Sequence, residues 1–160
     1  MSTDIVPPHG GKLNPLILEG EELESQREKA KSMPSIRMTS RETSDLIMLA
    51  VGAFSPLAGF MLEKDYHSSV KEMRLDNGTL WPIPITLSVS REEADALPIG
   101  SEAALYDDET SELMGILTVK EKYEYNKEDE AKHVFHTADE KHPGVAKVYA
   151  QKDIYLGGPV

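Results

Sequence analysis

The hydrophobic periodicity of this chain changes once, at the turn sequence Asp76-Asn77-Gly78-Thr79. Before this turn, apolar residues recur at helical spacing, as in residues 63–73, where Tyr66, Val70 and Met73 share one face. After it, short apolar runs alternate with Gly, Pro and acidic turns, which is typical of strands. The Asn-Gly pair supplies the positive φ that a tight hairpin requires. These patterns predict a small α+β domain.

The first half of the chain is predicted to be largely helical. Thr39 is followed by Glu42 three residues later, a capping box that marks a helix start, and Gly52 marks its end. Pro34 ends the charged segment that precedes it. We expect helices over residues 21–31, 44–51 and 63–73 and a short strand over residues 35–38.

The second half is predicted to contain several short strands. Pro82 and Pro84 place the early part of the first of them at a sheet edge or bulge. We expect strands over residues 80–90, 103–106, 112–125 (one long or two short), 145–150 and 154–156, with helices over 91–96 and 126–136. Short strands with interspersed helices suggest a partly closed β-barrel.

Composition restricts the function. The 160 residues suffice for one domain, and 28 acidic against 17 basic residues give a formal charge of −11. This balance disfavours nucleic-acid binding, which relies on clustered Lys and Arg. No apolar run approaches the roughly 18 residues that span a bilayer, so no membrane contact is expected. The chain has no cysteine and no signal-like start, and we expect a cytoplasmic location.

Four segments, in order, resemble the N-terminal domain of ATP sulfurylases (sulfate adenylyltransferases). They are residues 44–61, 80–87, 142–145 and 155–160, and the His-Gly-Gly-Lys-Leu sequence of residues 9–13 is similar to the family's start. The resemblance implies a small PUA-like β-barrel with several short flanking helices. It assigns residues 1–156 to this domain and residues 157–160 to the start of an interdomain linker.

The resemblance also implies an activity, and the part of the enzyme that carries it. The family transfers the adenylyl group of ATP to sulfate, giving adenosine 5'-phosphosulfate and pyrophosphate. A separate α/β domain carries a Gln-x-Arg-Asn-Pro sequence that runs into His-x-x-His, and a Gly-Arg-Asp sequence. This chain contains no Gln-x-Arg-Asn-Pro sequence and no Gly-Arg-Asp sequence. Its one His-x-x-His, formed by His133 and His136, precedes the Gly-Gly-Pro tail, whereas the catalytic pair of the family follows it. We interpret that pair as a coincidence.

The catalytic domain is therefore expected to be absent. We predict no catalytic, cofactor-binding or metal-binding residues in this chain, and ATP with Mg is expected in the catalytic domain of the full enzyme. Adenylyl transfer needs cations and oriented donors around the phosphate, to which an acidic chain without a Gly-rich phosphate loop is poorly suited.

Two groups of family-signature residues are candidates for an interdomain contact. The first is a loop that Pro and Gly exclude from regular helix, and it could alternatively be fastened into its own core by aromatic packing. The second could approach the active site of the full enzyme. There, turn geometry accounts for the Pro and Gly but not for an imidazole. The residues are Phe54, Pro56, Leu57, Gly59 and Phe60 in the first group and His142, Pro143 and Gly144 in the second.

The favoured function is a noncatalytic scaffold for the catalytic domain of the same enzyme, in a protein that could be a homo-oligomer. The alternative is a free-standing PUA-like module that binds RNA or a small ligand, which rests on fold analogy alone. A metal site at His133 and His136 would need a third ligand, which the sequence does not indicate.

Overall fold

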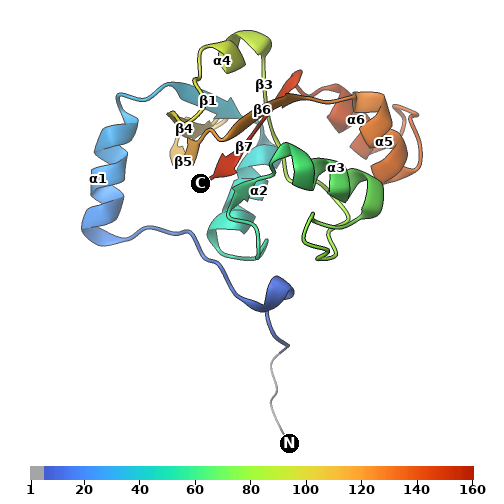
Figure 1. Cartoon of the computed structure of the whole chain (residues 1–160). Coiled ribbons are helices and arrows are strands. Elements are labelled where there is room, and N and C mark those ends of the chain that lie inside the picture. Colours follow the sequence, from blue (N-terminus) through green and yellow to red (C-terminus); the bar gives the residue numbers. More distant parts are fainter. Residues whose placement is uncertain (1–5) are drawn as a thin grey trace, which may run out of the picture.

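The computed structural model describes residues 6–160, which form two small sheets with helices around them (Figure 1). Residues 1–5, on which the expected absence of a signal peptide partly depends, lie outside the described residues. The first sheet has the order β1-β4-β5, where β1 (Ser35–Met38) runs parallel to β4 (Glu102–Asp107) and β4 is antiparallel to β5 (Leu113–Thr118).

The second sheet is organised around β7 (Ile154–Pro159). β7 pairs antiparallel with three strands: β3 (Leu87–Val89), β6 (Glu121–Glu124) and, at its far end, β2 (Gly59–Phe60). The side chains at Tyr155 and Leu156 are fully buried. The end of the chain is therefore a central strand on which the second sheet depends.

The expected β-barrel is not seen as a closed sheet. Over the described residues, the strands form two separately hydrogen-bonded sheets, although β5 lies close to β7. The mixed α+β class is confirmed. Closure requires an unbroken hydrogen-bonded circuit, and among residues 6–160 no strand ladder joins the first sheet to the second.

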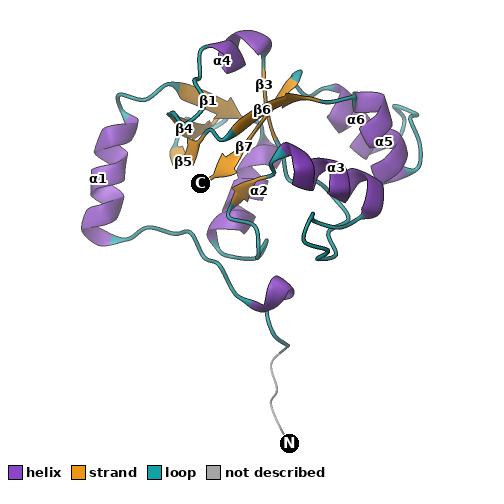
Figure 2. Cartoon of the chain, in the orientation of Figure 1, coloured by secondary structure: helices purple, strands orange, loops and turns teal. Residues whose placement is uncertain are grey.

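The helices surround the two sheets (Figure 2), and α2 (Ser40–Ala50) packs against β1, β4 and β5 of the first sheet. Both α2 and α4 begin with capping boxes, Thr39 with Glu42 and Ser90 with Glu93, so the predicted box is confirmed. Asn126 caps α5, as expected. The helices are η1 (His9–Gly11), α1 (Gly20–Ala30), α2 (Ser40–Ala50), α3 (Glu63–Glu72), α4 (Arg91–Asp95), α5 (Lys127–Phe135) and α6 (Pro143–Tyr149).

Four sequence-based expectations were wrong or too broad. Residues 145–150, predicted as a strand, form most of α6 and its C-terminal cap Ala150, because His142 caps the start of the helix and Pro143 occupies its first turn. Of residues 80–90 only Leu87–Val89 is a strand, and the predicted hairpin is reduced to one bridge between Arg74 and Leu80. Residues 157–159, expected to begin a linker, are the end of β7, with Gly157 and Gly158 buried.

The predicted split of residues 112–125 into two strands is confirmed as β5 and β6. Within residues 6–160, no helix has the length and apolar character needed to cross a membrane.

Candidate functional site

The signature loop, residues 54–60, follows α2 and is fastened by polar contacts from both sides. Ser55 Oγ donates to the carbonyl of Gly52 at 2.6 Å and accepts from the Asn14 N–H at 2.8 Å. The Asn14 side chain donates to the carbonyl of Leu57 at 3.3 Å. These bonds satisfy backbone groups that a loop packed on a core would otherwise leave unpaired.

Glycine is required where this loop meets the end of the chain. Gly59 lies opposite Pro159 and Phe60 opposite Gly158. A Cβ on Gly59 would lie 2.1 Å from the Gly158 carbonyl oxygen, and one on Gly158 would lie 2.0 Å from the Thr118 carbonyl oxygen. Since these neighbours are backbone atoms, side chains at these positions would force the strands apart.

The N-terminal His-Gly-Gly segment packs on the other side of the same loop. His9 Nε2 lies 2.7 Å from the Leu80 carbonyl oxygen, and its ring centroid is 5.8 Å from that of Trp81. Gly10 has a φ of 73°, and a Cβ there would lie 2.8 Å from Pro56 Cγ. This segment is therefore shaped to the loop.

Trp81 joins the signature loop to residues 80–87. Trp81 is 8% exposed, and its ring meets Phe54 edge-on, with centroids 5.8 Å apart. This indole is thus packed into the core, where it completes the contact between the loop and residues 80–87. The four segments at residues 9–13, 44–61, 80–87 and 155–160 meet at one place.

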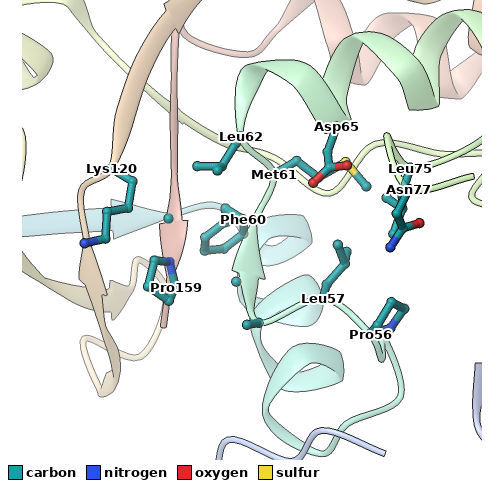
Figure 3. A pocket seen from close by; sticks show the side chains of 13 residues that line it. Pro56, Leu57, Phe60, Met61, Leu62, Asp65, Leu75, Asn77, Lys120 and Pro159 are labelled. Carbon is teal, nitrogen blue, oxygen red and sulfur yellow. The ribbon is translucent and has the colours of Figure 1, made fainter. Parts of the chain in front are cut away.

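A cavity of about 290 Å³ opens beside this junction (Figure 3). Pro56, Leu57 and Phe60 line it from the loop, with Pro159 across from them. The polar side chains on its wall are Asp65, Asn77 and Lys120.

Two of those polar groups are already engaged. Asp65 Oδ1 accepts from the Asp76 N–H at 2.8 Å, and Asn77 Oδ1 accepts from the Thr79 N–H at 2.9 Å. The exposed Lys120 lies at the rim of the cavity. No nucleophile lies within reach of a base in this wall, so the arrangement suits contact with another surface better than bond-making chemistry.

The His142 group lies elsewhere, on α6, which packs against α5. His142 Nδ1 accepts from the Gly144 N–H at 3.1 Å, so the imidazole acts as a helix cap. A Cβ on Gly144 would lie 2.5 Å from the ring of Phe135, which is tilted by 38° against the His142 ring with centroids 5.0 Å apart. His142, Pro143 and Gly144 therefore have local structural roles, and they do not line the cavity.

His133 and His136 are separated by the end of α5. His133 Nδ1 lies 2.8 Å from the Asp129 carbonyl oxygen, while His136 has left-handed backbone geometry just past the helix. Among residues 6–160, no cluster of three His, Asp or Glu side chains could hold a metal ion.

A buried carboxyl, Glu130, lies among tyrosines behind the second sheet. Glu130 Oε2 lies 2.8 Å from the Tyr66 hydroxyl and 3.0 Å from the Tyr155 hydroxyl, and the latter also lies 2.6 Å from Gln151 Oε1. A phenol has one hydrogen, so both Tyr155 contacts are satisfied when Glu130 is protonated and donates. Burial raises the pKa of Glu130, in the same direction.

Asp45 on α2 has an unusual environment. Burial raises the pKa of this carboxyl to about 6, outweighing the Arg41 guanidinium, whose Nη1 lies 2.9 Å from Asp45 Oδ2. Arg41 also donates to the carbonyl of Thr86 at 3.2 Å. This cluster joins α2 to the start of β3 and contacts no cavity wall described above.

A sequence model of the PUA-like domain family matches residues 6–160, and the chain belongs to this family. Comparison with curated proteins identifies relatives of this chain. The chain is 52% identical over 158 residues to a sulfate adenylyltransferase from Pelodictyon phaeoclathratiforme and 53% identical to one from Chlorobaculum tepidum. A third, from Desulforamulus reducens, is 48% identical over 156 residues. The predicted resemblance to sulfate adenylyltransferases is confirmed.

These matches cover 98% of this chain but only 39% to 40% of the relatives, so the chain spans about two fifths of their length. Among solved structures, a hexameric APS kinase from Thiobacillus denitrificans is similar, with a TM-score of 0.71 and 27% identity. That similarity covers 97% of this chain and 26% of the other.

The signature loop predicted as a contact candidate lies at the junction, but the second predicted group, residues 142–144, does not, and the sequence interpretation missed two contributors to the junction. His9 and Gly10 were taken as a family start without a site role, and Gly158 and Pro159 as a linker. The signal for the second was the Gly157-Gly158 pair, because adjacent glycines in a strand pattern mark a close backbone approach.

Proposed function

We propose that this chain is a noncatalytic supporting domain of a sulfate adenylyltransferase, the enzyme that forms adenosine 5'-phosphosulfate and pyrophosphate from ATP and sulfate. Its similarity to three such enzymes over 98% of its length carries this proposal. ATP and Mg would bind to the catalytic part of the longer protein, in a cytoplasmic setting. The hexameric relative favours a homo-oligomer.

The junction around the signature loop is the proposed contact with the catalytic part. Ala58 and Pro159 are exposed at its rim, beside the cavity. Leu80 and Ile83, in the adjoining segment, leave 53% and 54% of their surface exposed. Apolar groups held on a rigid surface are typical of a protein contact.

The proposal is tested by pyrophosphate release from ATP and sulfate. We expect no release by the 160-residue chain alone, and release when it is mixed with the remaining part of the Chlorobaculum tepidum enzyme, expressed separately. ATP-dependent product from this chain alone would refute a noncatalytic role.

The contact surface is tested in the same assay with two matched variants. Ala58→Glu places a carboxylate at the proposed contact, and we expect about tenfold weaker activation on mixing. Ile99→Glu adds the same charge at another exposed apolar site, 58% exposed between α4 and β4, and should leave activation unchanged. Equal effects of the two variants would contradict this contact. Salt-dependent RNA binding by the chain would instead support the alternative module.

A further inference from the structure

A second groove, of about 430 Å³, lies on the side of the molecule where α1 stands. Its inner wall comes from α2 and β5, including Leu46, Met114 and Ile116, and its outer wall from α1 and the extended segment before it, including Leu16 and Leu23. The larger part of its lining is therefore aliphatic. Such a surface is suited to an apolar side chain.

Within the outer wall, the Leu16 N–H donates to the Ala50 carbonyl at 2.8 Å, whereas α1 is weakly anchored. Ala30 is the one residue of α1 that is buried. An 11-residue helix is marginal in water without tertiary packing, so α1 depends on whatever fills the groove beneath it. Ile17 and Leu18, just before α1, remain 59% and 37% exposed.

Val160 is part of the groove lining. Its N–H donates to the carbonyl of Ala58 at 3.0 Å, which fixes the direction of the polypeptide as it leaves β7. Residues following position 160 in a longer protein would start inside the groove, and each extended residue advances by about 3.3 Å. The relatives have about three fifths of their length outside the matched region.

We propose that this groove receives an apolar side chain from the polypeptide that directly continues Val160 in the longer protein, and that this contact holds α1 against the domain. The proposal rests on the proposed function for the existence of that longer protein. It identifies the occupant as the connecting segment of the same polypeptide. The groove would then be a second contact, besides the signature loop, between this domain and the rest of the longer protein.

Thiol labelling tests the proposal, because the chain contains no cysteine. Met114→Cys places a single thiol in the groove, and Met73→Cys places one at a 52% exposed site at the end of α3. Each variant is made in the 160-residue chain and in the same chain continued by the next segment of the Chlorobaculum tepidum enzyme. About fifteen residues suffice, since they span up to about 50 Å.

We expect maleimide labelling at position 114 to be about tenfold slower in the extended chain, and labelling at position 73 to be unchanged. Leu23→Glu, which places a carboxylate in the groove, should restore fast labelling at position 114 in the extended chain. Equal rates at position 114 with and without the extension would overturn the proposal. Protection in the unextended chain that grows with protein concentration would also overturn it, because it would identify a second copy as the occupant.

Labelling requires no catalysis, so the two proposals can fail separately. Slow labelling at position 114 in an inactive full-length fusion would support the groove and count against the proposed function. Fast labelling in an active fusion would do the reverse.

Discussion

Replacing Glu42 with Ala should be among the most destabilising single changes in this protein. The carboxylate is 1% exposed and connects the start of α2 to β3. One oxygen accepts from the N–H and hydroxyl of Thr39 at 2.9 and 2.8 Å, and the other accepts from the N–H and hydroxyl of Ser88 at 2.8 and 2.9 Å. Its removal leaves two buried donors, the N–H and the hydroxyl of Ser88, without this partner, and it also removes the cap contact to the more exposed Thr39.

The magnitude follows from these contacts. Each unsatisfied buried donor costs about 1–3 kcal/mol, and loss of the cap adds about 1 kcal/mol. We therefore expect Glu42→Ala to lower the free energy of unfolding by about 4 kcal/mol, which corresponds to a fall of about 12 °C in Tm for a domain of this size.

Glu93 provides a matched control, because it occupies the same position in the capping box of α4 but is only half-buried. Glu93→Ala also removes an ion pair with Lys152, at 2.8 Å, and should cost only about 1 kcal/mol. The assay is urea unfolding followed by the fluorescence of Trp81, the single tryptophan. If Glu42→Ala costs no more than Glu93→Ala, the reasoning from buried hydrogen bonds is wrong.

Three further predictions concern stability. Gly59→Ala should lower the free energy of unfolding in urea by about 3 kcal/mol, because its Cβ would lie 2.1 Å from a backbone oxygen. Gly78→Ala, with no atom within 4 Å, should lower it by only about 1 kcal/mol, because of its positive φ alone. Equal losses would contradict the close approach at Gly59. His142→Ala should lower the free energy of unfolding by about 1 kcal/mol, and His142→Asp should keep the wild-type value, because helix capping needs only a hydrogen-bond acceptor. A loss of stability in His142→Asp as large as in His142→Ala would indicate a role for the imidazole. The pKa of Asp45 is raised from 3.8 to about 6 in the folded state, so between these pH values the folded state binds more protons than the unfolded state, and the free energy of unfolding falls as pH rises. Asp45→Asn should remove this fall from a series of unfolding free energies measured at different pH. An unchanged slope would contradict the raised pKa.

The helices could be read from the sequence because their signals are local. Thr39 and Glu42, or Asn126, mark a helix start within one turn, and no distant residue is needed to interpret them. The exception is α6, where residues 145–150, which include Val145, Val148 and Tyr149, were predicted to be a strand. There the cap is an imidazole, His142, which lies outside the usual set of capping residues.

Only part of the candidate site could be predicted from the sequence. The order of the signature segments was enough to identify the family, but not to show that residues 9–13, 44–61, 80–87 and 155–160 meet at one loop while residues 142–145 lie elsewhere. Gly157 and Gly158 match a flexible hinge as well as they match a close-packed strand, and the choice depends on Thr118 and Gly59, which are distant in sequence.

The sequence by itself determined the α+β class, most helix boundaries, the acidic net charge and the family, since each depends on composition, short-range pattern or ordered motifs. Only the tertiary structure decided that residues 154–159 form the central strand of the second sheet, that the strands do not close into one sheet, and that a groove lies beneath α1. These depend on which backbone groups pair across long sequence separations, and that pairing is set by the packing of the whole domain.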